Sequence, residues 1–491
     1  MIRAVCRLAL LAGIALVSTA HVGSPDAWFE GSAGPYRVTV HIEAPLVVPG
    51  IAVVNVRATD SVERITAFVN TFDAEGGTPP PDELRPAADR PGWRRASLWV
   101  MNAGSNRVTI EVHGPRGRGD VVVPLAAVAQ RRLAISGPFI LAVIAGGTIL
   151  VAGMLTLVGA MVREGVLAPG KVPDEERRRR ARRAMLRATA VIALVLAGTT
   201  YWWRAEDRAF QRRLYRPLEI STRVDTTGGT ARLILAITDS AWLNRDDVAL
   251  VRARGELPSA GLIDDHGKLM HLFLVATAGS AMAHLHPATT DTVTFTSLLP
   301  PLPGGSYRVF ADIVHQSGFT QTLVSELVMP GTRGDEAAPL TDIDDSWAVA
   351  SSDSARVTLQ DGTGLVWDRD SLPLRAGTEA GLRFLVTSRS NGSAALEPYL
   401  GMPGHAAVIR DDGQVFIHLH PMGTISPAAQ ARLASNQHGS GHSPPPATTF
   451  PDTLRFPYAF PDAGRYTVWV QLKREGRVLT GAFRAEVQPA R

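Results

Sequence analysis

Short stretches in which apolar and polar residues alternate make up most of the chain outside a central apolar region. Before that region, six such stretches are separated by Gly, Pro and Asn, and they occupy residues 36–42, 51–56, 65–72, 98–101, 108–112 and 121–125. Alternation with a period of two predicts half-buried β-strands. About seven short strands within a segment of ~110 residues favour an immunoglobulin-like β-sandwich for residues 21–134.

Two long apolar runs interrupt the strand pattern. Residues 139–162 carry no charge, and their length suffices to cross a bilayer core of ~30 Å at 1.5 Å per residue. Residues 188–203 form a shorter run that ends in Tyr201, Trp202 and Trp203, as an interfacial aromatic belt does. We therefore expect transmembrane helices over residues 135–162 and 187–203.

The first 20 residues have the order of features that is typical of a cleaved signal peptide. Arg3 and Arg7 come first, a short apolar run follows, and small residues precede a cut after Ala20. The alternative is an uncleaved anchor, for which the apolar run is short.

The segment between the two apolar runs, residues 163–186, is rich in arginine. It contains Arg177–Arg180, Arg182 and Arg183, and the positive-inside rule places such a loop in the cytoplasm. An alternative role is binding of anionic lipid or of an acidic partner. The sequence thus predicts a two-pass protein of the cytoplasmic (inner) membrane, surrounded by its lipid bilayer, with its large domains in the periplasm.

Composition narrows the possible chemistry. The only cysteine, Cys6, lies in the expected signal peptide, so disulfides and thiolate metal sites are excluded from the mature chain. The net charge of +4 arises from the arginine-rich loop, and no basic stripe interleaved with aromatic residues indicates nucleic-acid binding. With 45 Gly and 34 Pro, the chain has the many turns that short strands require.

An internal repeat is the clearest pattern in the chain. Residues 271–287 read HLFLVATAGSAMAHLHP and residues 405–421 read HAAVIRDDGQVFIHLHP, so each has a His, twelve residues, and then His-Leu-His-Pro. A Gly-x-Tyr strand follows each copy, at Gly305 and at Gly464. Residues 204–335 and 336–491 are therefore expected to be two copies of one periplasmic β-sandwich, an internal duplication.

Each repeated motif predicts a β-hairpin with three histidines on one face. Asp412-Gly413 is a favoured two-residue turn, and counting outward from it pairs His405 with His420 and puts His418 on the same side. The same count about Ala278-Gly279 pairs His271 with His286 and puts His284 beside them. A three-residue turn with a bulge is the alternative, and it would turn His405 to the opposite face.

The Cβ atoms of directly opposed residues lie ~4.5–5.5 Å apart. Three imidazoles on such positions are close enough to bind one metal ion. We expect two metal sites, made of His271, His284 and His286 and of His405, His418 and His420. Histidine and methionine without cysteine suit copper best, with zinc and nickel as alternatives. Further histidines and methionines lie near the motifs: His266, His315, His438, His442, Met270, Met282, Met402 and Met422.

Two further expectations concern the position of these histidines. A proline follows each His-Leu-His, and because proline ends strands we expect the histidines near a rim of the sandwich. The alternative to metal binding is that they are structural and hydrogen-bond loops at that rim. His438 and His442 lie in a Gly/Ser/Pro-rich stretch that fits a linker better than a ligand loop.

The N-terminal sandwich offers a weaker candidate site. Cleavage after Ala20 would make His21 the first residue, and its amino and imidazole nitrogens, with His41 or His113, would form a copper brace. On these features the chain resembles uncharacterised bacterial exported membrane proteins with CopC-like, YtkA-like or FixH-like immunoglobulin-type sandwiches. Some of those are tied to copper handling or oxidase assembly, so the resemblance implies a metal-related role.

We find no sequence motif of an enzyme. A nucleophile elbow, a P-loop, a dinucleotide fingerprint, a His-Glu-x-x-His helix and an EF-hand loop are all missing from the sequence, and the paired aspartates at 264–265, 344–345 and 411–412 lie in turn contexts. The first hypothesis is a membrane-anchored periplasmic copper-binding protein for storage, delivery or sensing. The second is a structural accessory subunit that docks other subunits of a membrane complex.

Overall fold

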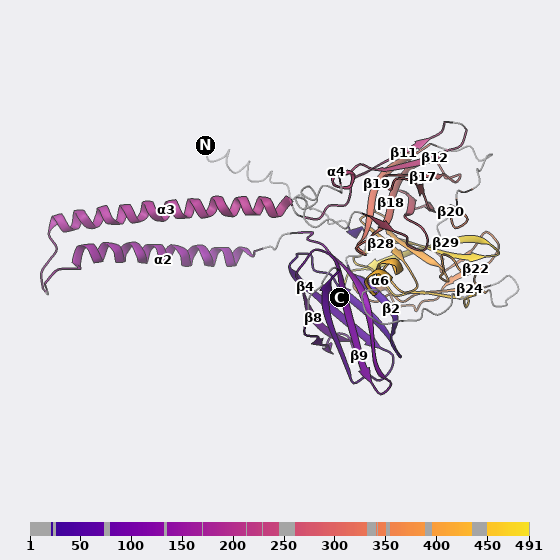
Figure 1. Cartoon of the computed structure of the whole chain (residues 1–491), viewed down its shortest axis with the longest axis horizontal. Helices are drawn as coiled ribbons and strands as arrows, with labels where there is room; N and C mark the ends of the chain where they lie inside the picture. Colours follow the sequence, from indigo (N-terminus) through magenta and orange to yellow (C-terminus); the bar gives the residue numbers. More distant parts are fainter. Residues whose placement is uncertain are drawn as a thin grey trace. The chain divides into compact units, whose positions relative to one another are not determined.

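The computed structural model describes residues 21–22, 26–72, 79–131, 135–168, 170–212, 214–227, 229–244, 261–330, 340, 342–349, 354–387, 395–434 and 449–490. The chain forms two compact units, one made of residues 1–128 with 216–491 and the other of residues 129–215. The first unit is built from mainly antiparallel sheets and the second from two long helices, so the protein is mainly β, as the alternating pattern predicted (Figure 1).

Residues 27–127 form two sheets that follow the N-terminal strand pattern. The five-stranded sheet has the order β2 (Ala27–Ala33), β3 (Tyr36–Glu43), β4 (Gly50–Ala58), β8 (Arg94–Val100) and β7 (Arg85–Pro86). The four-stranded sheet has the order β10 (Gly117–Ala127), β9 (Gly104–Gly114), β5 (Arg64–Thr71) and β6 (Asp82–Glu83). Alternate residues such as Val38, Val40, Ile110 and Val112 are at most 1% exposed, because both sheets bury one face.

The first repeat also consists of two sheets. One has the order β11 (Ile220–Asp225), β12 (Arg232–Ile237), β17 (Thr294–Leu298) and β16 (Ala288–Thr289). The other has the order β13 (Leu262–Ile263), β18 (Gly305–His315), β14 (His271–Ala276), β15 (Ala281–Leu285) and β20 (Ser346–Val349), and β19 (Thr320–Met329) pairs with β18. Leu233, Leu235 and Phe295 of one sheet share a core with Leu272, Leu274 and Val309 of the other. The short helix α4 (Ser240–Leu243) follows β12.

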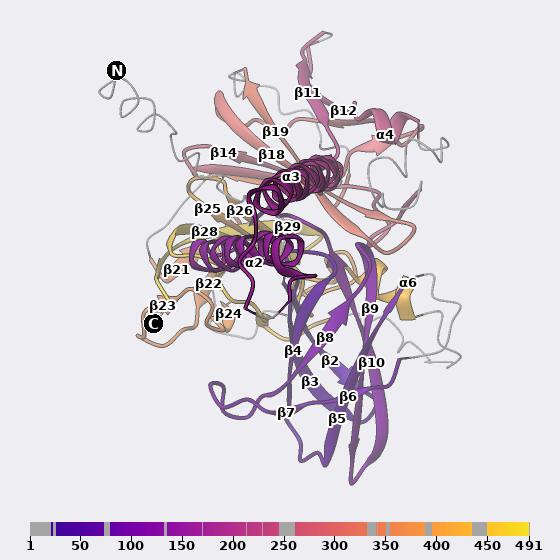
Figure 2. The same ribbon diagram turned by 90° about the vertical axis from the view of Figure 1, so that its left-hand side faces the viewer.

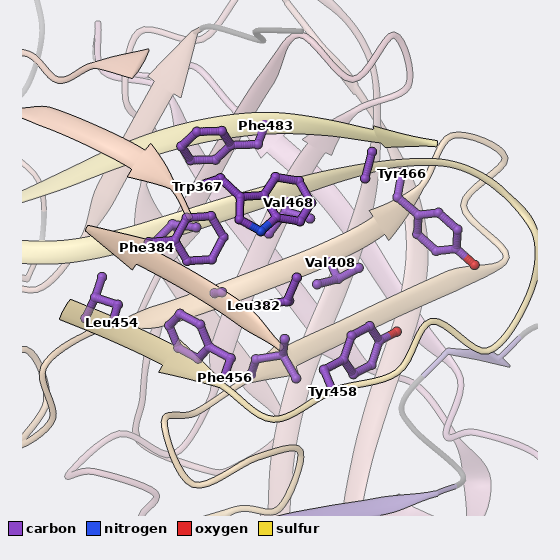
Figure 3. Close-up of a cluster of buried hydrophobic side chains, with 14 of the residues drawn as sticks. Trp367, Leu382, Phe384, Val408, Leu454, Phe456, Tyr458, Tyr466, Val468 and Phe483 are labelled. Carbon is purple, nitrogen blue, oxygen red and sulfur yellow. The ribbon is translucent and has the colours of Figure 1, made fainter. Parts of the chain in front are cut away.

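The second repeat has the same arrangement. Its smaller sheet has the order β21 (Arg356–Thr358), β22 (Gly364–Trp367), β24 (Leu382–Thr387) and β27 (Thr453–Phe456). Its larger sheet has the order β1 (His21–Val22), β26 (Val415–Leu419), β25 (His405–Arg410), β28 (Gly464–Arg474), β29 (Arg477–Gln488) and β23 (Leu374–Arg375). Figure 3 shows Phe384 and Phe456 meeting Val408, Val468 and Phe483 between the two sheets. Helix α6 (Pro427–Ala434) follows β26.

The two repeats agree in detail. Tyr307 and Tyr466 stand at the same place in β18 and β28, and each hydroxyl donates to the carbonyl four residues earlier, at 2.9 Å to Pro303 and 2.8 Å to Asp462. In the turn five residues before the first histidine, His266 and Leu400 both have positive φ, 57° and 51°, and a glycine with positive φ follows each. Two successive left-handed residues are the signature of a tight two-residue turn.

The two repeats pack on each other through their larger sheets. Phe273, Met282 and Phe310 of the first repeat form one apolar cluster with Phe416 and Trp469 of the second, and Phe310 stacks on Phe416 at 4.2 Å with an interplanar angle of 6°. Figure 2 shows β14 and β18 beside β25 and β26. Each hairpin is thus buried on both faces, one face by its own core and the other by the opposite repeat.

Two short strands cover the edges of the hairpins. β20 pairs with β15, so Ser346–Val349 completes the sheet of the first repeat, although the expected domain boundary at 335/336 assigned these residues to the second. β1 pairs with β26 at the equivalent edge, and His21 lies opposite Val415. Covering an edge strand satisfies backbone groups that would otherwise be open to pairing with another chain.

The second unit is a helical hairpin of α2 (Gly137–Glu164) and α3 (Glu175–Arg212), which lie side by side (Figures 1 and 2). Both helices are long and apolar enough to cross a membrane. The helices approach closely at Gly159, where an added Cβ would lie 2.7 Å from Sδ of Met185.

The bounds of α3 differ from the expected loop at 163–186 and span at 187–203. The helix begins at Glu175 and continues to Arg212, so the arginine cluster lies on its first turns. Acidic residues in the first turn favour the helix N-terminus, and Glu175 and Arg179 pair at 3.0 Å one turn apart. Ala, Arg and Leu are strong helix formers, which explains why the helix extends beyond the apolar run.

Candidate metal centre

The six histidines of the repeated motifs gather in one cluster between the two repeats. In β14 and β15, Leu272 pairs with Leu285, and in β25 and β26, Ala406 pairs with Leu419. These are the registers expected from two-residue turns, and they put all three histidines of each hairpin on the face that meets the other repeat. The parity expected from the sequence is therefore confirmed, and the bulged alternative is wrong.

The expected position near a rim is wrong. His284 and His405 are 0% exposed, and the most exposed of the six, His418, reaches only 9%. The prolines do end the strands, since β15 stops at Leu285 and β26 at Leu419. The histidines are nevertheless buried because the opposite sheet covers the hairpin face on which they lie.

His271, His284 and His286 form one triangle of imidazoles. Each offers one ring nitrogen, and these nitrogens lie within 4.8 Å of one another. The ring centroids are 5.4 Å apart for His271 and His284, 5.1 Å for His271 and His286, and 4.6 Å for His284 and His286. The shortest approach joins His271 Nδ1 to His284 Nε2 at 3.2 Å.

Protein acceptors hold the outer nitrogen of each ring in this triangle. His271 Nε2 lies 3.2 Å from the carbonyl of Asp265, and His286 Nδ1 lies 3.0 Å from a carboxylate oxygen of Asp345. His284 Nδ1 lies 2.9 Å from Oε1 of Gln471. Because carbonyl and carboxylate oxygens only accept, each outer nitrogen carries the proton.

The hydrogen bonds of Tyr399 agree with this assignment of the protons. Its hydroxyl donates to the carbonyl of Asp344 at 3.1 Å, so its oxygen is left to accept from His284 Nδ1, also at 3.1 Å. In neutral imidazoles the other nitrogens then carry the lone pairs, and these are His271 Nδ1, His284 Nε2 and His286 Nε2. A proton acceptor on the far nitrogen is the usual support of a metal-bound histidine.

The second triangle differs from the expected set. His266, His405 and His420 bring their nitrogens within 4.8 Å of one another, and His266 comes from the first repeat. His418, expected in this set, lies between the two triangles instead. Its ring centroid is 5.3 Å from that of His271 and 4.5 Å from that of His420, and its Nδ1 is 3.4 Å from a carboxylate oxygen of Asp312.

Many ring nitrogens of the cluster have no hydrogen-bond partner among the described residues. They are buried, and they are His266 Nε2, His286 Nε2, His405 Nδ1, His405 Nε2, His418 Nε2, His420 Nδ1 and His420 Nε2. Buried polar groups are nearly always paired, and each that is not costs about 1–3 kcal/mol. These unpaired nitrogens are the atoms of the cluster that could bind a metal ion.

Burial favours the neutral form of five of the six motif histidines. It lowers the pKa of His271, His284, His405 and His420 well below 6.5, and repulsion from neighbouring imidazoles of the cluster adds to the effect. Burial likewise lowers the pKa of His418 to about 3. Burial raises the pKa of Asp312 to about 6, against a hydrogen bond from Thr322. Neutral imidazoles are the form that binds metal ions.

An acidic segment between the repeats supports one side of the cluster. Asp345 accepts both from the ring of His286 and, at 2.7 Å, from its backbone N–H. His286, Asp342 and Asp345 also come within metal-binding distance of one another. Lys268 pairs with Asp342, however, and Lys473 pairs with Asp344 at 2.8 Å, so we assign this segment to holding His286 in place.

The N-terminal domain makes hydrogen bonds to the chain just after His420. Trp28 N–H donates to Oγ1 of Thr424 at 2.9 Å, and Thr424 N–H donates to the carbonyl of Trp28 at 3.0 Å. Glu30 N–H donates to the carbonyl of Met422 at 2.8 Å.

The remaining sequence candidates lie elsewhere. Met270 packs in the core of the first repeat and Met282 in the apolar cluster between the repeats. His315 Nε2 contacts Oε1 of Gln321 at 3.2 Å. The ring of His41 stacks on Trp28 at 4.2 Å in the N-terminal domain. His438, His442 and the side chain of His21 lie outside the described residues.

Sequence reasoning missed the residues that support the cluster from outside the two motifs. His266 was only a flanking residue, Asp345 was interpreted as a turn residue, and Gln471 was not considered. Their signal was the repeat itself: Asp312 pairs with His271 in β18, and Gln471 pairs with His405 at the same place in β28. Polar residues at equivalent points of otherwise apolar strands mark a shared polar site.

Comparisons with known proteins cover the fold only in part. A family model described as a domain of unknown function, DUF8832, matches residues 356–489, the second repeat from β21 to the end of β29. No curated protein matches the chain.

Solved structures resemble the chain only distantly. An engineered protein is 23% identical over 20% of this chain and 21% of its own, with a TM-score of 0.15. A tetra-tandem repeat from a large adhesion protein is 10% identical over 90% of this chain and 71% of its own, with a TM-score of 0.14. The chicken CNTN1 FN1–FN3 domains are 9% identical over 93% and 98%, with a TM-score of 0.13.

Proposed function

We propose that this chain is a membrane-anchored metal-binding protein and that the histidine cluster between its repeats is the metal site. The observation that carries the proposal is the triangle of His271, His284 and His286. Each ring has one nitrogen held by a protein acceptor, and the three rings bring one nitrogen each within 4.8 Å of the others. Two lone pairs 3.2 Å apart, on His271 and His284, repel each other unless a cation lies between them.

Copper is the metal we propose, and its singly charged form in particular. The ligands are imidazoles without thiolate, which suits copper, zinc and nickel. Transfer of an ion from water into a buried site carries a Born penalty that rises with the square of the charge. A closed site at most 4% exposed therefore favours copper(I) over a divalent ion.

The location we propose follows from the apolar helices and the charge pattern. α2 and α3 would cross the cytoplasmic membrane as a pair, with the arginines at the start of α3 on the cytoplasmic side. The three β-rich domains would then lie in the periplasm as immunoglobulin-like sandwiches, the last two related by duplication. In that place the protein would store, deliver or sense copper.

Metal analysis of the purified full-length protein in detergent tests this function. The protein is loaded anaerobically with Cu(I), and separately with Zn(II) or Ni(II), freed of excess ion, and analysed for bound metal. We expect copper to be retained, and to be lost from the triangle in a His284→Ala/His286→Ala variant. The matched control is His438→Ala, which removes an imidazole of the Gly/Ser/Pro-rich stretch that fits a linker better than a ligand loop. Metal at background level in the unmodified protein refutes the proposal.

A further inference from the structure

We propose a second metal ion in the cluster, held by His266 of the first repeat together with His405 and His420 of the second. The inference rests on the proposed function, since it assigns a second ion to the same cluster. The three side chains bring one ring nitrogen each within 4.8 Å of the others. The ring centroid of His266 lies 5.6 Å from that of His405 and 5.3 Å from that of His420.

The unpaired nitrogens of this triangle point to a ligand. Neither nitrogen of His405 or His420 has a hydrogen-bond partner among the described residues, although the side chains are 0% and 3% exposed. A neutral imidazole always carries one N–H, so each ring buries an unmet donor as well as an unmet acceptor. An ion bound to these lone pairs would give the unpaired acceptor nitrogens of the interface a partner.

The asymmetry between the repeats explains how this site arises. The position equivalent to His266 is Leu400, which has nearly the same φ, 51° against 57°. The first repeat therefore supplies an imidazole, His266, to the triangle of the second repeat. The second repeat has Leu400 at this position and supplies no imidazole to the first triangle. In its place Tyr399, one residue before Leu400, reaches His284 of the first triangle.

His418 lies between the two triangles. Its ring centroid is 5.3 Å and 5.5 Å from those of His271 and His284, and 5.4 Å and 4.5 Å from those of His405 and His420. Its Nε2 is buried without a partner among the described residues. This position between the triangles makes the two proposed sites neighbours.

Two consequences follow for binding. Neighbouring cations repel each other, so the two ions bind with unequal affinity. The second ion also has ligands from both repeats, so its binding free energy stabilises the interface between them, as any ligand of the folded state does.

The test compares metal stoichiometry in four forms of the full-length protein: unmodified, His266→Leu, His286→Gln and the double variant. Leucine is the residue that the chain itself uses at the equivalent turn, so His266→Leu is compatible with the turn. Each form is loaded with Cu(I) alone and its bound metal is counted by elemental analysis and native mass spectrometry. We expect two bound ions in the unmodified protein, one in each single variant and none in the double variant. We also expect a smaller metal-induced rise in Tm for His266→Leu than for the unmodified protein.

The outcomes separate this inference from the proposed function. If His266→Leu keeps the full copper content of the unmodified protein, the second site is refuted while the first stands. One ion in the unmodified protein, unchanged by His266→Leu and lost in His286→Gln, likewise refutes the second site alone. No copper in the unmodified protein refutes the proposed function itself. A measurement of Tm without metal shows that each variant is folded.

Discussion

His284 of the first repeat donates its Nδ1–H to Oε1 of Gln471 in the second, across 2.9 Å and 187 positions of sequence. The reciprocal pair is His418 of the second repeat and Asp312 of the first, at 3.4 Å. Gln471 and Asp312 occupy the same place in their repeats, so the contact is a two-fold exchange in which each repeat orients the middle histidine of the other. The cluster therefore requires both repeats in their docked arrangement.

Asp345→Asn tests the support of His286. The asparagine keeps the shape and one acceptor but removes the charge that fixes the imidazole, and loss of such a partner typically lowers metal affinity 10- to 100-fold. We expect that decrease in a competition titration with a copper(I) chelator. Asp344→Asn is the matched control, because Asp344 pairs with lysines and not with a ring nitrogen. Equal affinity in the two variants would contradict the role of Asp345.

His405→Phe should stabilise the metal-free protein. The substitution removes two unpaired buried nitrogens and keeps an aromatic ring against Tyr399, whose centroid is 4.9 Å away. We expect the free energy of unfolding to rise by about 1 kcal/mol, the usual penalty of an unmet polar group. Chemical denaturation of protein freed of metal measures it.

The control for that prediction is His271→Phe, which should have the opposite effect. His271 Nε2 donates to the carbonyl of Asp265, and phenylalanine removes this buried hydrogen bond. A fall in stability for both variants would mean that the ring nitrogens of His405 do have hydrogen-bond partners, which would contradict the prediction.

Acid should destabilise the metal-free protein below pH 6.5. Burial holds the pKa of His418 at about 3 in the folded chain, against 6.5 as the ordinary value. Between these values the unfolded chain binds more protons, so the free energy of unfolding falls as pH falls, by up to about 1.4 kcal/mol per pH unit for each such histidine. The buried histidines whose pKa is well below 6.5 act in the same direction: His271, His284, His405 and His420.

Asp312 acts the other way in this window. Its pKa is raised to about 6, so the folded chain takes up this proton before the unfolded chain does, which offsets part of the loss. Denaturation at a series of pH values from 7.5 to 5 measures the slope. Stability that rises on acidification would show that the imidazoles are not neutral in the folded chain.

Phe416→Ala tests the apolar part of the interface. Phe416 is 0% exposed and stacks on Phe310 of the other repeat, and truncation of a buried phenylalanine costs about 3–5 kcal/mol. We expect a loss of that size in the free energy of unfolding, together with faster loss of bound copper to a chelator. Val328→Ala is the control, since Val328 is 74% exposed and should change stability by less than about 0.5 kcal/mol. A loss below about 1 kcal/mol for Phe416→Ala would contradict tight packing of the repeats.

The sequence predicted the local geometry of the cluster well. A favoured turn and a period of two determine which residues oppose each other, and this placed His405 opposite His420 and all three histidines on one face. The docking of the two faces was not predicted, because it depends on the fit of surfaces that are far apart in the chain. A signal was present nonetheless: β14 and β25 are apolar at consecutive positions, as strands buried on both faces are.

Other features escaped prediction for separate physical reasons. His266 reaches the cluster from a turn with positive φ, and periodicity says nothing about where such a turn points. Asp345 is in a turn, as interpreted, but the turn lies against His286 because β20 joins the other repeat. The start of α3 was misplaced because hydropathy identifies the apolar part of a helix and not its charged first turns.

Burial of the cluster would limit the rate at which a bound ion exchanges with solvent. No imidazole of the six is more than 9% exposed, and the stacked phenylalanines adjoin them. A bound ion would escape only during transient separation of the two halves, so its residence time would follow the opening rate rather than the strength of the metal–nitrogen bonds. Such an arrangement favours long retention of the ion, and release would require separation of the two repeats.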